Sequence, residues 1–341
     1  MLNTVYRLVS PRQIEAEFKD VDVNGDNIIV RPTHLSICHA DQRYFQGSRP
    51  PEILKKKLPM ALIHEAIGKV VFDPQRMIAP GTKVVMVPNT PVESDEIIAE
   101  NYLRSSKFRA SGYDGFMQDV VSMRRDRVVV LPEGLDNYVA AFTELVSVSN
   151  HTIDRFLNKS HSRRNTVGVW GDGNVAYITA LLLKKRLPET KIVVFGKHEY
   201  KMHDFMFADK CFNIGEIPQD MLVDHAFECV GGVGAATSIN QIIDFIQPEG
   251  CIATMGVSED NVPINTRMVL EKGLTIFGSS RSGAADFVNT LNIYKEKPEI
   301  VEYLSRIVGE VVIVNSINDM LTAFDRDFQR RVGKTIMVWE K

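Results

Sequence analysis

A glycine-rich turn near the middle of the chain is the feature that most restricts its possible folds. Residues 166–170 form a short apolar run, residues 171–176 read Gly-Asp-Gly-Asn-Val-Ala, and residues 177–186 place apolar side chains at helical spacing. Between a buried strand and a helix, a G-x-G-x-x-A turn is typical of dinucleotide binding, because its small residues admit the pyrophosphate and the helix N-terminus faces the phosphates. The pattern predicts a dinucleotide-binding domain with these cofactor contacts: Gly171, Gly173, Asn174, Val175 and Ala176.

The alternation of strand and helix patterns continues after this turn. Apolar runs at 191–195, 225–230, 251–255 and 274–277 predict strands, and residues 235–246 have a helical pattern. Strands that alternate with helices favour a mostly parallel sheet with crossover helices. The expected fold class is therefore α/β, with a Rossmann-type doubly wound sheet in this part of the chain.

The first part of the chain has a different pattern. Residues 27–31, 66–72 and 82–87 predict short strands separated by proline and glycine, which is typical of an irregular β-rich domain. A chain of 341 residues exceeds the usual domain size of about 150 residues, which favours two domains. We expect a β-rich domain over 1–150, a dinucleotide-binding domain over 151–280, and a return of residues 281–341 to the first domain.

Composition excludes several classes of protein. The chain is 44% hydrophobic and 24% charged with a net charge of −3, so neither a basic nucleic-acid-binding surface nor a membrane protein is expected. The N-terminal residues lack a secretory signal pattern, which predicts a cytoplasmic protein. The four cysteines show no C-x-x-C spacing, so no disulfide framework is expected, and we expect three of them to pack as small buried hydrophobic residues: Cys211, Cys229 and Cys251.

The residues after the 191–195 strand indicate which dinucleotide binds. An NAD enzyme usually places an Asp or Glu there against the ribose 2′-hydroxyl, whereas this chain has Gly196, Lys197 and His198. Lys197 could donate a charge-assisted hydrogen bond to a 2′-phosphate. We therefore predict NADPH as the cofactor, with Gly196 and Lys197 at its binding site; the alternative is that Lys197 is a solvated turn residue.

Three residues upstream of the glycine turn form a candidate zinc site. Cys38, His64 and Glu144 offer a thiolate, an imidazole and a carboxylate, a donor set that suits Zn²⁺ and leaves a fourth position open. Taken singly, each residue could instead be an ordinary core or helix-start residue. An open zinc site in a chain with a dinucleotide-binding domain predicts hydride transfer at a carbonyl or an alcohol.

Together these segments resemble the zinc-dependent medium-chain alcohol and polyol dehydrogenase family. In that family a Cys-x-x-Asp segment, a His-Glu pair and a later Glu or Cys surround the catalytic zinc ahead of the nucleotide domain. The resemblance extends over essentially the whole chain, including residues 80–84 and 112–116. It implies a GroES-like catalytic domain with Cys38, His64 and Glu144 as zinc ligands, Glu65 as an exchangeable ligand, and Asp41 orienting the site.

Two departures from the family pattern alter these expectations. Residues 88–111 contain none of the four cysteines of the family's structural-zinc lobe, so one catalytic zinc per chain is expected. Ala40 stands where many members have a Ser or Thr that starts a proton relay. The proton must then travel through water, Glu65, Tyr44 or a substrate hydroxyl.

Four further segments, 85–91, 99–103, 170–174 and 278–283, resemble bacterial members that reduce a phosphorylated pentulose with NADPH to supply cell-wall teichoic acid or capsule polymers. The resemblance implies that zinc polarises the C2 carbonyl, that the chain forms a homodimer or homotetramer, and that a cytidylyltransferase acting on the product is a functional partner. A phosphorylated substrate needs cations, and Lys55 to Lys57 are interpreted as a solvated face. The candidates for its phosphate are Arg43, Arg49, Arg104, Lys107, Arg109 and Arg281.

Two other functions are compatible with the sequence. One is an NAD-dependent zinc polyol dehydrogenase of the sorbitol or xylitol type, which Tyr44 favours and the missing carboxylate after Phe195 disfavours. The other is an NADPH-binding reductase or scaffold protein without zinc chemistry.

Overall fold

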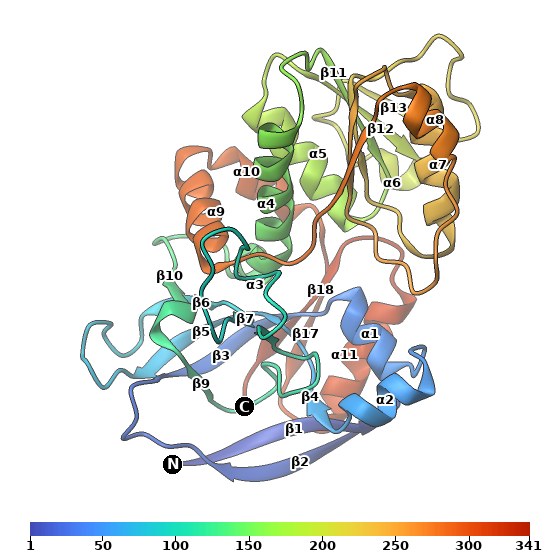
Figure 1. Ribbon diagram of the computed structural model, residues 1–341. Coiled ribbons are helices and arrows are strands. Elements are labelled where there is room, and N and C mark those ends of the chain that lie inside the picture. The colour runs from blue at the N-terminus through green and yellow to red at the C-terminus, as the bar shows by residue number, and fades with distance from the viewer. The chain divides into compact units, whose positions relative to one another are not determined.

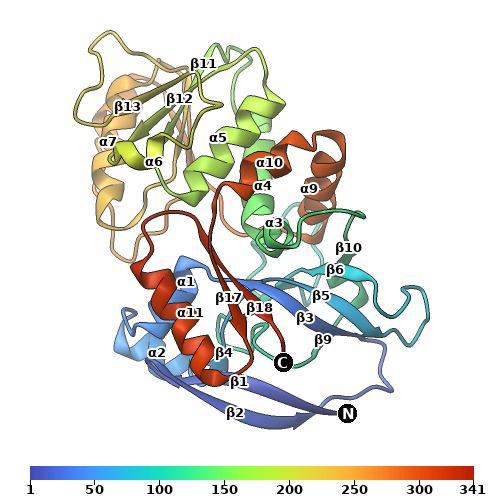
Figure 2. The same ribbon diagram turned by 180° about the vertical axis from the view of Figure 1, so that it is seen from behind.

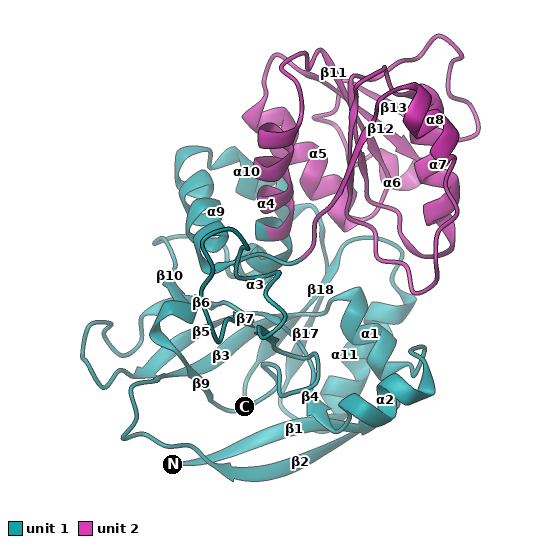
Figure 3. Ribbon diagram, viewed as in Figure 1, with its two compact units in different colours: residues 1–147, 281–341 teal, residues 148–280 magenta.

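The computed structural model describes residues 1–341, which divide into two compact units (Figure 3). Unit 1 contains residues 1–147 and 281–341, and unit 2 contains residues 148–280. The sequence analysis placed the domain boundaries after residues 150 and 280. Both ends of the chain therefore contribute to unit 1.

Unit 2 is built on a six-stranded sheet in which every neighbouring pair is parallel. The strand order is β13-β12-β11-β14-β15-β16, which is the order of a doubly wound dinucleotide-binding fold. The predicted α/β fold class is confirmed. The strands are β11 (Thr166–Trp170), β12 (Lys191–Gly196), β13 (Lys210–Asn213), β14 (His225–Glu228), β15 (Cys251–Thr254) and β16 (Thr275–Gly278).

Helices connect these strands, and apolar side chains fill the space between helices and sheet. Trp170 stacks on Phe195 with ring centroids 3.9 Å apart. Cys251 is buried and Cys229 half-buried, but Cys211 is exposed, so the prediction of a buried Cys211 is wrong, because it lies on the edge strand β13. The helices of this unit are α5 (Asn174–Arg186), α6 (Glu199–Met202), α7 (Ala235–Phe245), α8 (Thr266–Glu271) and the larger part of α4 (Thr143–Lys159).

Unit 1 contains three sheets (Figure 1). The largest has the order β10-β6-β5-β3-β18-β17, with β9 also paired to β3; a second has the order β2-β1-β4, and β7 pairs with β8. Their bounds are β1 (Leu2–Ser10), β2 (Gln13–Asp20), β3 (Ile28–Ser36), β4 (Met60–Ala61), β5 (Glu65–Phe72), β6 (Lys83–Met86), β7 (Asn89–Thr90), β8 (Lys107–Phe108), β9 (Val121–Met123), β10 (Val128–Val130), β17 (Val308–Val314) and β18 (Lys334–Trp339).

Helices pack on these sheets. Seen from behind in Figure 2, α11 lies beside β17 and β18, and its Phe324 stacks on Phe45 of α1 with ring centroids 4.4 Å apart. The helices of unit 1, besides the first residues of α4, are α1 (His39–Phe45), α2 (Pro51–Lys57), α3 (Asn137–Ala141), α9 (Ala284–Glu296), α10 (Glu299–Ser305) and α11 (Ile317–Gln329).

The register of three strands places the site of interest. Ser36 at the end of β3 pairs with Glu65 at the start of β5 and with Ile336 of β18. The residues just after β3 and just before β5 are therefore neighbours, although the sequence separates them. No helix of the structure has the length and apolar character that crossing a membrane requires.

Candidate functional site

Three potential metal ligands meet at this end of the β3–β5 pair. Cys38 precedes α1, His64 precedes β5, and Glu65 is the first residue of β5. One ligand atom from each, a sulfur, a ring nitrogen and a carboxylate oxygen, lies within 4.8 Å of the other two. His64 is 6% exposed and Glu65 is fully buried. The fold thus gathers donors from two separate segments into one group, in which Cys38 is half-buried and the other two are buried.

Asp41 fixes the positions of two of these residues. Its Oδ2 accepts a hydrogen bond of 3.1 Å from the Cys38 backbone N–H, and its Oδ1 accepts one of 3.0 Å from the Ile63 N–H. The same Oδ1 lies 3.6 Å from Nδ1 of His64. Ile63 has a φ of +71°, which is unfavourable for a β-branched residue, so this bond helps to hold a strained residue directly before His64.

A buried lysine accompanies Glu65. Lys334 of β18 donates from Nζ to Glu65 Oε1 at 2.8 Å and to the Ile37 carbonyl at 2.9 Å. The other carboxylate oxygen, Oε2, is buried and has no hydrogen-bond partner. The sequence analysis missed Lys334, because a lysine at the start of an apolar strand has no local pattern that sets it apart from a surface residue.

Glu144 lies beside this group. It is the second residue of α4 and is 5% exposed. Burial raises the pKa of its carboxyl to about 7, an effect opposed by the charge of His64 and increased by that of Glu65. The charges of both residues thus act on Glu144, but its carboxylate is not among the ligand atoms that lie within 4.8 Å of one another.

The group fits a zinc ion. Thiolate, imidazole and carboxylate donors are those that zinc prefers, and the unpartnered Glu65 oxygen is a buried acceptor that a cation would satisfy. Although burial lowers it, the charges of Asp41 and Cys38 raise the pKa of His64 well above its usual value. Since a ligand imidazole must be neutral, metal binding at this site releases a proton.

The position that lacks the relay hydroxyl, Ala40, and one relay candidate, Tyr44, lie on α1. Ala40 provides no hydroxyl, and Tyr44 is 3% exposed with the guanidinium of Arg49 4.5 Å above its ring. The ring of Tyr44 is therefore covered by a cation.

The glycine turn in unit 2 has the geometry that its sequence predicts. Gly171 has a φ of +131°, which disfavours any residue with a side chain, and Gly173 is the N-cap of α5. Gly173, Asn174 and Val175 are accessible, whereas Gly171 and Ala176 are buried under the turn. The accessible N-terminus of α5 is suited to a pyrophosphate.

A carboxylate in this turn organises the next loop. Oδ2 of Asp172 accepts hydrogen bonds from the Lys197 and His198 backbone N–H groups, both at 2.8 Å, and lies 2.9 Å from Nδ1 of His198. A Cβ at Gly196 would lie 2.7 Å from the Met202 sulfur and 3.0 Å from Cβ of Asp172. The place where NAD enzymes carry an acidic side chain is thus crowded, and the exposed Lys197 follows it. The sequence analysis named Lys197 but not Asp172.

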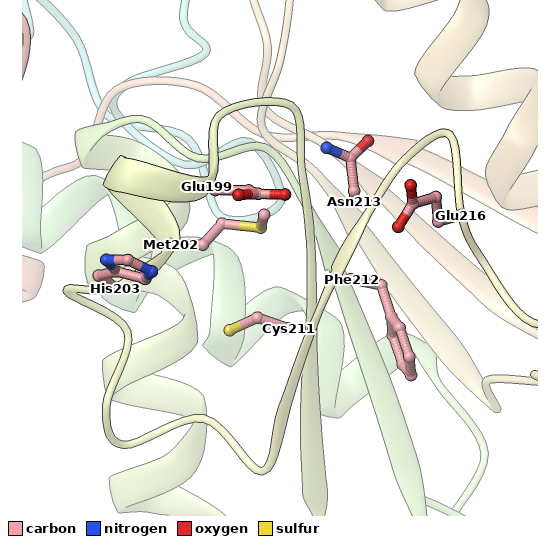
Figure 4. A pocket seen from close by; sticks show the side chains of 7 residues that line it. All are labelled: Glu199, Met202, His203, Cys211, Phe212, Asn213 and Glu216. Atoms are coloured by element: carbon pink, nitrogen blue, oxygen red, sulfur yellow. The ribbon is translucent and has the colours of Figure 1, made fainter.

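A cavity of about 310 Å³ lies next to this loop, between α6 and β13 (Figure 4). Two carboxylates line it and no lysine or arginine does, so it does not suit a phosphate. The residues that line it are Glu199, Met202, His203, Cys211, Phe212, Asn213 and Glu216.

The candidate phosphate ligands, all of which belong to unit 1, differ in their exposure and in their contacts. Arg109 donates to the carbonyls of Asp114 at 3.2 Å and Ser122 at 2.9 Å, which gives it a structural role. Arg104 and Lys107 are exposed on the surface.

Arg43, Arg49 and Arg281 are half-buried. Of the three lysines that were interpreted as a solvated face, Lys57 does not fit that description. It is half-buried and donates to Oγ of Ser111 at 2.8 Å, because it ends α2 on the side toward that loop.

A unit with a buried Cys-His-Glu group and a unit with a parallel dinucleotide-binding sheet define a zinc-type dehydrogenase. The family model "Alcohol dehydrogenase GroES-like domain" matches residues 24–133, and "Zinc-binding dehydrogenase" matches residues 208–296. The chain belongs to the zinc-dependent medium-chain alcohol and polyol dehydrogenase family.

Its similarity to particular members covers the whole chain. It is 55% identical over 340 residues to "Ribulose-5-phosphate reductase" of Bacillus spizizenii, covering 100% of both chains. It is 55% identical to "Ribulose-5-phosphate reductase 1" of Staphylococcus aureus, covering 99% of both. The crystal structure of S. aureus TarJ in complex with NADPH matches with a TM-score of 0.91 and 50% identity over 100% of both chains.

Proposed function

We propose that this protein reduces D-ribulose 5-phosphate to D-ribitol 5-phosphate with NADPH. The observation that carries the proposal is the 55% identity over the full length to a reductase of that substrate. The chain also keeps the buried group of Cys38, His64 and Glu65. A zinc-dependent hydride transfer needs both a metal site and a nucleotide fold, and the chain has both.

Cys38, His64 and Glu144 would hold the zinc, with Glu65 as the exchangeable ligand. When bound there, zinc supplies Lewis-acid polarisation of the substrate carbonyl. Lys334 offsets the charge of Glu65, and Asp41 keeps Cys38 and His64 in place. The hydride adds to C2 and a proton adds to the carbonyl oxygen; that proton comes through water, Glu65, Tyr44 or a substrate hydroxyl, since Ala40 has no hydroxyl.

The nucleotide contacts come from the glycine turn and the loop after β12. The N-terminus of α5 would bind the pyrophosphate, and Lys197 would bind the 2′-phosphate. Three hydrogen-bond donors around Asp172 stabilise its charge and lower the pKa of its carboxyl despite burial. Asp172 lies directly between Gly171 and Gly173, and because these donors already pair with its charge, it is compatible with a phosphorylated cofactor at this turn.

The experiment that tests the function is NADPH oxidation by the purified zinc-loaded protein with ribulose 5-phosphate, free ribulose, xylulose 5-phosphate and fructose. Turnover of ribulose 5-phosphate above the other ketoses is expected. Absence of that turnover would remove the proposal, and oxidation of sorbitol or xylitol with NAD would support the polyol dehydrogenase alternative instead. Cys38→Ser, which removes a zinc ligand, should lose turnover and stoichiometric zinc together.

A variant of the cofactor site tests the choice of NADPH. Lys197→Asp should lower kcat/KM for NADPH by roughly 10- to 100-fold, because a hydrogen bond to a charged group contributes about 1.5–3 kcal/mol. Equal kcat/KM for NADH and NADPH in the wild-type protein would contradict this part of the proposal.

We also propose a cytoplasmic location, a homodimer or homotetramer, and a cytidylyltransferase that uses the product for teichoic acid or capsule precursors. The support is the resemblance of residues 85–91, 99–103, 170–174 and 278–283 to enzymes of that process.

A further inference from the structure

Cations from three separate segments of unit 1 lie close enough for their charges to interact, and one of them shares the Phe108 ring with His64 of the candidate metal group. Arg49 follows α1, Lys57 ends α2, and Arg281 begins the second segment of the unit. All three are half-buried, in contrast to the exposed Lys55 and Lys56 of the same helix α2. A fold that brings cations together below its surface works against their repulsion and their loss of hydration, so the cluster requires an explanation.

Aromatic and hydroxyl groups hold each cation in place. The Arg281 guanidinium lies 4.7 Å from the centroid of the Phe108 ring, and that of Arg49 lies 4.5 Å from the centroid of Tyr44. Lys57 donates from Nζ to Oγ of Ser111 at 2.8 Å and to its carbonyl at 3.2 Å. These contacts fix the positions of the cations.

The charges act on one another. Burial and the positive charges of Arg49 and Arg281, with a further contribution from Lys56, lower the pKa of Lys57. Lys57 is therefore in a surrounding that disfavours its own charge. A dianion bound among the three side chains would reverse that effect, because each cation would gain an opposite charge.

The cluster lies at a useful position relative to the metal group. The Phe108 ring contacts both groups: its centroid lies 5.3 Å from that of the His64 ring and 4.7 Å from the guanidinium of Arg281. In a pentulose 5-phosphate, five bonds separate the carbonyl carbon from the phosphorus, about 6 Å when extended. A metal ligand and a cation that both contact one aromatic ring are near enough to serve the reacting carbon and the phosphate of one such substrate.

Arg281 also has an unusual backbone. Its φ is +59°, in the left-handed region that residues with side chains avoid. Such conformations are concentrated at functional sites.

We infer that Arg49, Lys57 and Arg281 form the subsite that binds the phosphate group of the substrate, an inference that rests on the proposed function. Arginine forks suit phosphate oxygens, and lysine adds a point charge. The subsite keeps Arg49 and Arg281 of the six sequence-based candidates and adds Lys57. It leaves Arg43, Arg104, Lys107 and Arg109 outside.

The test compares a phosphorylated with an unphosphorylated substrate. kcat/KM is measured for ribulose 5-phosphate and for free ribulose with the zinc-loaded enzyme and its Lys57→Gln and Arg281→Asn variants. Asparagine tolerates a positive φ, so Arg281→Asn removes the charge without changing the backbone. Each variant should lose about 10- to 100-fold for ribulose 5-phosphate and far less for free ribulose. Arg281→Lys should retain part of the activity.

A second readout does not require turnover of free ribulose. Inorganic phosphate should compete with ribulose 5-phosphate in the wild-type enzyme, and its inhibition constant should rise in Lys57→Gln and Arg281→Asn. Lys55→Gln, which removes an exposed lysine of the same helix, is the matched control and should behave as wild type.

The outcomes separate the two proposals. Suppose that the wild-type enzyme reduces ribulose 5-phosphate, but that Lys57→Gln and Arg281→Asn have the same kcat/KM and the same inhibition by phosphate as the control Lys55→Gln. The subsite inference is then wrong and the proposed function stands. An equal loss for both ketoses with unchanged phosphate inhibition overturns it as well. If the wild-type enzyme does not reduce ribulose 5-phosphate, the proposed function fails first.

Discussion

Replacing Lys334 by methionine tests how much its pairing with the buried Glu65 contributes to the stability of the protein. The Lys334 side chain is 2% exposed and that of Glu65 is fully buried, and their ion pair measures 2.8 Å. Methionine has a similar length and no charge. In the metal-free protein, Lys334→Met would leave Glu65 buried with neither its cation nor a metal ion.

The expected effect is large. Breaking a buried ion pair by removing one partner costs about 3–5 kcal/mol. Lys334 also donates to the Ile37 carbonyl, next to Cys38, and that hydrogen bond is lost as well. For a unit of about 200 residues, 1 kcal/mol shifts the melting temperature by about 2–4 °C, so Lys334→Met should lower it by about 6–20 °C.

Zinc should reduce this loss, because the metal then provides the positive charge that Lys334 provided. The assay is thermal unfolding of wild-type protein and Lys334→Met, each after chelation and after reloading with zinc. The difference in melting temperature between the two proteins should be larger without zinc than with it. Lys334→Met combined with Glu65→Gln should be more stable than Lys334→Met alone, since the unpaired charge is gone.

Lys69→Met is the matched control, because it removes an exposed lysine from the same strand as Glu65. It should change the melting temperature by no more than about 2 °C, as surface substitutions usually do. If metal-free Lys334→Met melted as close to wild type as this control, the reasoning about the buried pair would be refuted.

Three further predictions concern the same sites. In the metal-free protein the pKa of Glu144 is about 7 against 4.5 in an unfolded chain. The stability that protonated Glu144 contributes is therefore fully present below about pH 4.5 and is lost as the pH rises through about 7. The melting temperature of the wild-type protein should fall for this reason between about pH 5 and 8, and that of Glu144→Gln should not show this fall. Asp172→Asn should raise the KM for NADPH several-fold with little change in kcat, because the loop carrying Lys197 and His198 loses an anchor; steady-state kinetics check this, and unchanged KM contradicts it. A chelator should abolish turnover and added zinc should restore it in the wild-type protein but not in Cys38→Ser, as activity and metal analysis would show.

Much of the fold could be predicted, because apolar residues recur along the sequence at the spacing of strands and helices. The strand expected over 225–230 ends at Glu228, because Glu228 turns its carboxylate back to accept the N–H groups of Val230 and Gly231, both at 2.8 Å. Strand β13 was missed because Lys210 and Cys211 are exposed at the sheet edge and give no apolar pattern. Such features of the folded structure override local propensity, and the spacing of apolar residues in the sequence does not reveal them.

The site could be predicted only as far as short motifs extend. Cys38, Asp41, His64 and Glu65 lie in recognisable segments, whereas Lys334 lies 269 positions from Glu65 and becomes its partner only through the pairing of β3 with β18. Lys57 was hidden in a run of three lysines whose first two are exposed. Which member of such a run turns inward depends on where its helix ends and what lies beside that end.

The candidate metal group and the cationic cluster each have a strained backbone residue in or next to them. Ile63 precedes His64 and Arg281 belongs to the cluster, and both have a left-handed φ that costs about 1–2 kcal/mol. Ile63 is held by Asp41 at its N–H and by the Phe116 N–H, which donates to its carbonyl at 2.8 Å. Asp41 therefore positions His64 through the backbone as well as through the imidazole. The strain is thus adjacent to the groups that we propose bind zinc and the substrate phosphate, where relaxation of the backbone would move a ligand away from its target.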